Sequence, residues 1–127
     1  TVVNFWFTTC SPCVGELADL DALNQELAKK GGALIGINAF TLGGDETAIA
    51  EAKSVLTKKG ATYQNVYFDG NSTAGKFVED IFAYPTTYVV DRNGNIMGDP
   101  IVGAITEKAQ AAALQAQIDA ALAADAG

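Results

Sequence analysis

The sequence predicts an α/β fold in which a mixed central sheet lies between helices, a three-layer α/β/α sandwich. Strand patterns alternate with helical patterns over most of the chain, which is typical of parallel strands joined by helices. Toward the C-terminus, Asn93-Gly94 separates two extended segments, and this strong hairpin signal adds antiparallel strands. The 127 residues are enough to bury one core, so a single domain over residues 1–127 is expected.

Apolar spacing and turn residues place the first elements. Val2–Phe7 is a short run of β-branched and aromatic residues, and residues 33–40 are almost continuously apolar, as buried parallel strands require. The helix between them should run from about Cys13 to Lys30, where Gly31-Gly32 stops it. The residues that share its buried face are Leu20, Leu23 and Leu27.

The same signals place the rest of the chain. The second arm of the hairpin contains Gly98 and Pro100, which indicate a bulge or a sheet edge. The remaining elements expected in order are a helix capped by Asp45 and ended by Gly60, a strand at residues 65–69, a helix from Ser72 or Thr73 to about Ile81, strands at residues 86–91 and 95–102, and a last helix capped by Thr106.

Both cysteines of the chain lie in the tetrad Cys10-Ser11-Pro12-Cys13, where the first helix begins. The unpaired N–H groups and the positive dipole end of a helix start favour an anion, so Cys10 is expected to have a lowered pKa and to act as nucleophile. Pro12 suits the first turn, where its missing N–H is not needed. Cys13 is then within disulfide reach as the resolving thiol.

Two other uses of this tetrad are less well supported. A zinc site needs two further N or S ligands, and the chain has no histidine and no third cysteine. A structural disulfide usually joins distant segments rather than residues three apart. Reversible redox exchange through the Cys10–Cys13 pair is therefore the favoured interpretation, with no metal and no separate cofactor.

Composition limits the class of partner and the setting of the protein. A net charge of −7 argues against nucleic acid, because phosphate binding needs a basic surface. No apolar run is long enough to span a bilayer, and no signal peptide is visible. Because the chain begins inside a strand pattern at Thr1, we expect an upstream segment to be missing.

Glu16 is an acid in an unusual place. Extending the apolar stripe of the first helix back one turn from Leu20 reaches Glu16, one turn beyond Cys13. One interpretation is a first-turn acid that faces water and complements the helix dipole. The other is a partly buried carboxyl with a raised pKa, which exchanges a proton with Cys13.

At this point the chain resembles the TlpA/ResA branch of thioredoxin-like thiol–disulfide oxidoreductases over essentially its whole length. The resemblance rests on Asn4-Phe5-Trp6, on the Cys-x-Pro-Cys-x-x-Glu spacing that ends at Glu16, and on Tyr84-Pro85-Thr86-Thr87 followed by residues 88–94. An inserted strand and helix between residues 61 and 81 matches that branch better than plain thioredoxin. The resemblance implies a thioredoxin-like fold and supports the buried interpretation of Glu16.

The resemblance also implies a role for several residues. Cys10 attacks and Cys13 resolves, while Pro85 is cis and lies against the disulfide, although the sequence alone equally allows a trans proline at a strand start. If it is cis, Tyr84 offers its backbone for strand-like pairing with an extended substrate. The residues expected to contact or border the substrate are Trp6, Thr9, Ser11, Pro12, Tyr84 and Pro85.

The chain departs from the family pattern in three respects, and at Asn4 it differs from plain thioredoxin. Thr9 replaces a tryptophan, and Tyr84 is bulkier than the residue that usually precedes this proline, so partner choice should differ. Thioredoxin carries a buried Asp where this chain has Asn4, which leaves Glu16 as the nearby proton carrier. The family's N-terminal hairpin and its anchor or signal do not occur in this chain.

These observations predict a reductase of disulfides in partner proteins. The resemblance implies a location outside the cytoplasmic membrane, a membrane tether and re-reduction by a membrane electron donor. A thiol peroxidase of the peroxiredoxin type is an alternative, but no proline precedes Cys10 as its Pro-x-x-x-Thr-x-x-Cys motif requires. A non-catalytic thioredoxin-like binding domain is the other alternative, since fold alone does not imply function.

Overall fold

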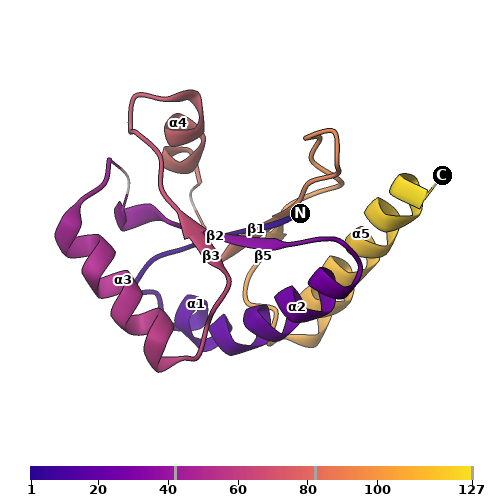
Figure 1. The fold of residues 1–127 in the computed structure, drawn as a ribbon, viewed down its shortest axis with the longest axis horizontal. Coiled ribbons are helices and arrows are strands. Elements are labelled where there is room, and N and C mark those ends of the chain that lie inside the picture. The colour runs from indigo at the N-terminus through magenta and orange to yellow at the C-terminus, as the bar shows by residue number, and fades with distance from the viewer. Residues whose placement is uncertain (42, 82, 127) are drawn as a thin grey trace.

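A mixed sheet with the strand order β3-β2-β1-β4-β5 forms the centre of the molecule (Figure 1). The structure is a computed structural model that describes residues 1–41, 43–81 and 83–126. Strands β3, β2 and β1 are parallel to one another. β4 is antiparallel to β1, and β5 is antiparallel to β4. The strands are β1 (Val2–Trp6), β2 (Leu34–Asn38), β3 (Gln64–Val66), β4 (Thr86–Val89) and β5 (Ile101–Val102).

Helices cover both faces of this sheet, which confirms the predicted fold class. The crossovers from β1 to β2 and from β2 to β3 step in the same direction, so right-handed connections put their helices on one face. The last helix returns to that face, whereas α4 lies across the sheet from it (Figure 1). The helices are α1 (Ser11–Gly15), α2 (Leu17–Lys29), α3 (Glu46–Lys58), α4 (Thr73–Glu79) and α5 (Lys108–Ala126), with a 3₁₀ turn, η1, at Ala39–Thr41.

The central strand β1 serves two separate cores because its side chains alternate between the faces. Val2 and Trp6 pack in the larger core beneath α2, α3 and α5, which also contains the cysteine pair. Phe5 packs with Ile37 and Val78 in the smaller core beneath α4. The polar residue of β1, Asn4, therefore points into the larger core.

The leucine spacing predicted one continuous helix from about Cys13 to Lys30, but the structure has a break at Glu16. The Glu16 N–H bonds back to the Cys13 carbonyl over three residues, and α2 then starts with the Leu20 N–H bonded to the Glu16 carbonyl. Glu16 makes no side-chain cap to α2, because its carboxylate turns inward. The break is what lets an acid lie against the sheet without interrupting the leucine face of α2.

Two further expectations near the C-terminus need correction. The second hairpin arm does not run over residues 95–102: Val90 pairs with Ile96 in a single bridge, and only β5 pairs with β4 beyond it. Gly98 and Pro100 lie in this interrupted stretch, and β5 lies at the sheet edge, as their positions indicated. The last helix begins at Lys108, so Glu107 rather than Thr106 takes the position before it.

Gly36 on β2 has no room for a side chain, because the side chain of Asn65 lies against its Cα. A Cβ at Gly36 would lie 2.1 Å from Asn65 Oδ1, the atom that accepts the Trp6 indole N–H at 2.9 Å. We expect Gly36→Ala to displace Asn65 and to lower the free energy of unfolding by about 1 to 3 kcal/mol, measured by chemical denaturation. Gly15→Ala is the control, because no atom lies within 4 Å of its added Cβ. Equal midpoints for the two variants would contradict this reading.

Candidate active site

The two cysteines form a disulfide at the N-terminus of α1, as the tetrad predicted. Cys10 is the residue that caps the helix, and the Cys13 N–H points at its sulfur, with N and Sγ 3.3 Å apart. The Cα atoms of the pair are 5.2 Å apart. Cys13 is fully buried, while Cys10 keeps 6% of its surface exposed.

This arrangement favours a thiolate at Cys10 once the disulfide is reduced. The Cys13 amide is one of the orphan N–H donors of a helix start, and it already faces the Cys10 sulfur. A hydrogen bond from an amide and the positive end of the helix both stabilise an anion at that atom. The geometry therefore suits Cys10 as the attacking sulfur and Cys13 as the protected one.

Glu16 is fully buried, which decides between its two interpretations in favour of the buried carboxyl. Burial raises the pKa of Glu16, and the nearby Asp19 charge adds to that effect. Two hydrogen bonds oppose it: Asn4 Nδ2 donates to one carboxylate oxygen at 2.9 Å, and the Ile105 N–H donates to the other at 2.8 Å. A raised pKa behind the cysteine helix is the property expected of a proton carrier.

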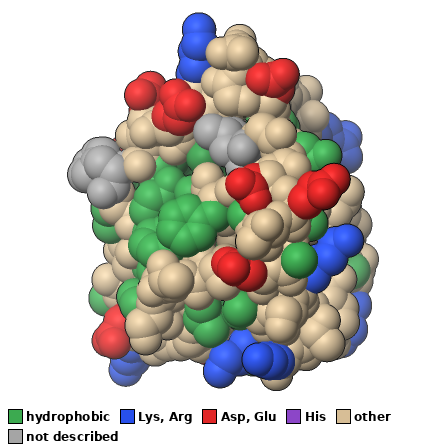
Figure 2. Space-filling view, turned by 90° about the vertical axis from the view of Figure 1, so that its left-hand side faces the viewer, with side chains coloured by type: hydrophobic (Ala, Val, Ile, Leu, Met, Phe, Trp, Pro, Cys, Tyr) green, Lys and Arg blue, Asp and Glu red, His purple; other side chains and the backbone are tan. Residues whose placement is uncertain are grey.

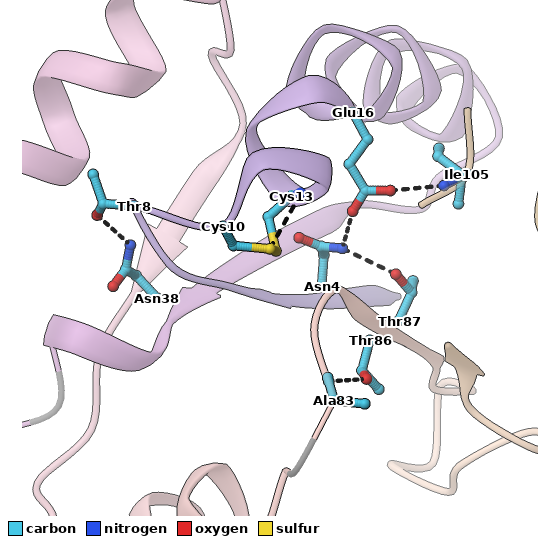
Figure 3. Close-up of a disulfide and its surroundings, with 10 residues drawn as sticks. All are labelled: Asn4, Thr8, Cys10, Cys13, Glu16, Asn38, Ala83, Thr86, Thr87 and Ile105. Atoms are coloured by element: carbon cyan, nitrogen blue, oxygen red, sulfur yellow. Dashed lines mark hydrogen bonds between the residues drawn. A yellow bond between two sulfur atoms is a disulfide. The ribbon is translucent and has the colours of Figure 1, made fainter. Parts of the chain in front are cut away.

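Asn4 links this carboxyl to a second strand (Figure 3). Its amide nitrogen also donates to Thr87 Oγ1 on β4 at 2.9 Å. Asn4, Glu16 and Thr87 are each 0% exposed. The sequence analysis placed Asn4 where thioredoxin has a buried Asp, but it did not connect Asn4 to Glu16. It also did not place Thr87 or the Ile105 N–H in the site.

The expected substrate-facing residues divide into exposed and buried ones. Thr9, Ser11 and Pro12 are exposed around Cys10. Tyr84 is half-buried, and its peptide bond to Pro85 is cis, as the resemblance implied. The Pro85 ring is buried, while its carbonyl accepts the Gly103 N–H.

Trp6 needs a correction. It is 0% exposed and packs in the same core as both cysteines, so its side chain offers no surface to a partner. Its indole N–H is held by Asn65 of β3. Trp6 therefore supports the cysteine helix from beneath instead of contacting a substrate.

A row of aromatic rings that the sequence analysis did not single out continues from Tyr84. The Phe7 ring packs edge-on against Tyr84 with centroids 5.2 Å apart, and against Phe40 with centroids 5.0 Å apart. Phe40 is 47% exposed, although it is a large apolar side chain. Exposed aromatic surface of this kind marks interaction sites more often than single scattered residues do.

The described residues contain no cluster of three or more His, Cys, Asp or Glu side chains arranged to hold a metal ion. In the same part of the chain, no helix has the length and apolar character needed to cross a membrane.

A cysteine pair at a helix start and a cis-proline directly before β4, on a sheet of this topology, define a thioredoxin-like protein with a dithiol–disulfide site. The chain belongs to the Redoxin family, whose profile matches residues 1–116. The curated relatives include the thiol-disulfide oxidoreductase ResA of Bacillus anthracis, 27% identical over 106 residues, and the thioredoxin-like protein YneN of Bacillus subtilis, 26% identical over 107 residues. The expected relationship to ResA-type proteins is thereby confirmed.

Solved structures support the same fold. A protein assigned as the thiol:disulfide interchange protein DsbE of Chlorobium tepidum superposes with a TM-score of 0.74 at 25% identity, covering 95% of this chain and 78% of that one. StoA of Bacillus subtilis superposes with a TM-score of 0.61 at 19% identity, over 81% of this chain and 72% of that one. The matches cover 84% of this chain but 56% of ResA and 58% of YneN.

Proposed function

We propose that this protein is a thiol–disulfide oxidoreductase that reduces disulfides in partner proteins. One observation carries the proposal: a disulfide whose more exposed cysteine faces a helix-start amide has a buried carboxyl one turn behind its second sulfur. Such an arrangement supplies an attacking thiolate at one end and a proton acceptor at the other. The names of the ResA relatives agree with this chemistry.

The reaction starts from the reduced pair. The Cys10 thiolate attacks one sulfur of the partner disulfide, which forms a Cys10–partner bond and releases the other partner sulfur as a thiolate. Glu16 then takes the proton of the Cys13 thiol, and the Cys13 thiolate attacks the Cys10 sulfur. The second partner sulfur leaves, so the partner gains two electrons and Cys10–Cys13 becomes a disulfide.

Insulin reduction tests this reaction directly. With dithiothreitol as the reductant, the protein is expected to accelerate the precipitation of insulin B chains well above the rate with dithiothreitol alone. Hydrogen peroxide is offered to the reduced protein in a parallel assay. Fast peroxide consumption without insulin reduction would establish a peroxidase instead, and inertness toward both would indicate a binding domain.

The direction of electron flow follows from the residues between the cysteines. Ser11-Pro12 contains no histidine to stabilise the Cys10 thiolate further, so the reduced form is not unusually favoured. We expect a reduction potential well below about −120 mV, the value of a strong oxidant. Equilibration with glutathione or dithiothreitol buffers, followed by alkylation, measures it. A value close to that of strong oxidants would reverse the proposed direction.

The aromatic row of Phe40, Phe7 and Tyr84 is proposed as the docking surface for apolar residues beside the partner's disulfide. One face of the molecule carries an apolar patch, and acidic side chains lie above it and to its right (Figure 2). The net charge of −7 has the same sign as these side chains and favours partners that are basic near their disulfide. Ser11, Pro12 and Thr9 would border such a partner, since they are exposed around Cys10.

Phe40→Ser is expected to raise KM for a protein disulfide about tenfold, because it removes the half-exposed ring that packs against Phe7 and leaves the cysteines in place. The rate with a small disulfide, hydroxyethyl disulfide, should stay unchanged. Val102→Ser is the matched control, since Val102 is similarly exposed but lies on the edge strand β5. An equal loss with both disulfides would argue against docking at this surface.

The location of the protein and its electron donor are proposed from the resemblance alone. We place the protein outside the cytoplasmic membrane, tethered there and re-reduced by a membrane electron donor, as its resemblance to the ResA group implies. Labelling of the cysteines in intact cells with a membrane-impermeant maleimide tests the location. Labelling only after cell lysis would overturn it.

A further inference from the structure

The carboxamide of Asn4 is incompletely bonded in the oxidised protein. Its nitrogen uses both hydrogens, one toward Glu16 and one toward Thr87, each at 2.9 Å. Its oxygen is buried and has no hydrogen-bond partner among the described residues. Buried acceptors are rarely left unpaired, so the position calls for a donor that is present in another state of the protein.

The two ends of this carboxamide face different partners. In Figure 3 the nitrogen is turned toward Glu16, and the oxygen is directed toward the sulfur atoms of the cysteine pair. A disulfide has no hydrogen to donate, whereas a thiol is a weak donor. Cys13 is buried in the same core, so reduction creates a buried S–H on the side that the unpaired oxygen faces.

This reasoning rests on the proposed function and deepens it. We propose that Asn4 is a positioning residue that couples the proton of Cys13 to that of Glu16. In the reduced protein its oxygen accepts the Cys13 S–H, and its nitrogen donates to the Glu16 carboxylate. A neutral thiol and a charged carboxylate are thereby held together, ready to exchange one proton.

The same carboxamide also suits the state after the exchange. The proton on Glu16 must then reside on the oxygen that faces Asn4, because the other oxygen has to keep accepting the Ile105 N–H. If the carboxamide turns over, its oxygen accepts from the Glu16 hydroxyl and its nitrogen donates to the Cys13 thiolate. The Thr87 hydroxyl fits both orientations, since it can accept or donate.

Other ionisable groups around the pair do not replace this coupling. Asp19 adds negative charge near Glu16. The Tyr63 phenol also interacts with Glu16, and burial raises the pKa of Tyr63 so far that it stays protonated at neutral pH. Cys10 lies beside Cys13, and its own thiol is removed in the experiment below.

The experiment titrates both partners in a Cys10→Ser background, where Cys13 is the sole thiol. Both groups are followed by carbon-13 NMR, Cys13 through its labelled Cβ and Glu16 through its labelled carboxyl. In Asn4→Leu the thiol loses its acceptor and the carboxylate its donor. We therefore expect the acid dissociation constant of Cys13 to rise about tenfold and that of Glu16 to fall about tenfold. Thr41→Val, which removes a buried hydroxyl elsewhere, should leave both constants within about twofold.

Asn4→Asp keeps the shape of the side chain and serves if Asn4→Leu fails to fold. An ionised Asp turns negative charge toward the thiol, so Cys13 should ionise at higher pH, opposite to the shift in Asn4→Leu. Unchanged titration of Cys13 in Asn4→Asp, or shifts of Cys13 and Glu16 in the same direction in Asn4→Leu, would overturn the proposal. Neither titration needs a substrate, so a failure of the insulin assay alone counts against the proposed function and leaves this coupling standing.

Discussion

Cys10→Ser is expected to abolish disulfide reduction, lowering the rate at least about a thousandfold, because a serine hydroxyl does not supply an anion at neutral pH. Cys13→Ser makes the same substitution one turn further along the same helix. It should stop the reaction one step later, with the partner bound covalently to Cys10. Rates of insulin reduction and non-reducing electrophoresis with a protein disulfide measure the two outcomes.

The contrast between the two variants is what tests the assigned roles. Cys10 is the slightly more exposed residue and has the helix-start amide at its sulfur, whereas Cys13 has no exposure. A mixed disulfide that accumulates with Cys10→Ser but not with Cys13→Ser would exchange the roles of the two cysteines. Capture of the same partners by a variant lacking both cysteines would instead identify a binding domain.

Glu16→Gln is expected to slow the resolution of the mixed disulfide about a hundredfold at neutral pH, since it removes the proton acceptor for Cys13 while keeping the side-chain shape. In the wild-type protein the rate should rise with pH as Glu16 ionises, over a range displaced above 4.5, the ordinary value for a glutamate. The variant should lack that rise. Single-turnover kinetics across pH, with the exposed Glu26→Gln as the matched control, measure both effects.

The same substitution changes how stability depends on pH. Because the pKa of Glu16 is raised in the folded state, the folded protein holds this proton more tightly than the unfolded chain does. The contribution of Glu16 to stability therefore falls as pH rises from about 4.5 through the folded pKa, and Glu16→Gln removes this contribution. The variant should gain stability relative to the wild-type protein over that interval, measured by urea denaturation. A constant difference across pH would contradict the raised pKa.

Local sequence signals placed most of the framework correctly. The tetrad Cys10-Ser11-Pro12-Cys13 begins a helix as expected, and Asp45 and Ser72 cap theirs as short polar residues do. Such signals act within one or two turns, so they can be read from neighbouring residues. Where the outcome depended on a distant contact they failed, as at Glu16, whose carboxylate turns inward to Asn4 and Ile105 at the point where one continuous helix was expected.

By itself the sequence determined the class of fold, the cysteine pair at a helix start and the presence of an acid on a buried stripe. Only the tertiary structure decided what that acid meets. Asn4 reaches Glu16 across 12 residues and Thr87 across 83, and the Ile105 N–H reaches Glu16 across 89. A buried carboxyl takes its pKa from the groups that replace water around it. These groups come together only when β1, β4 and the segment before α5 pack against the cysteine helix.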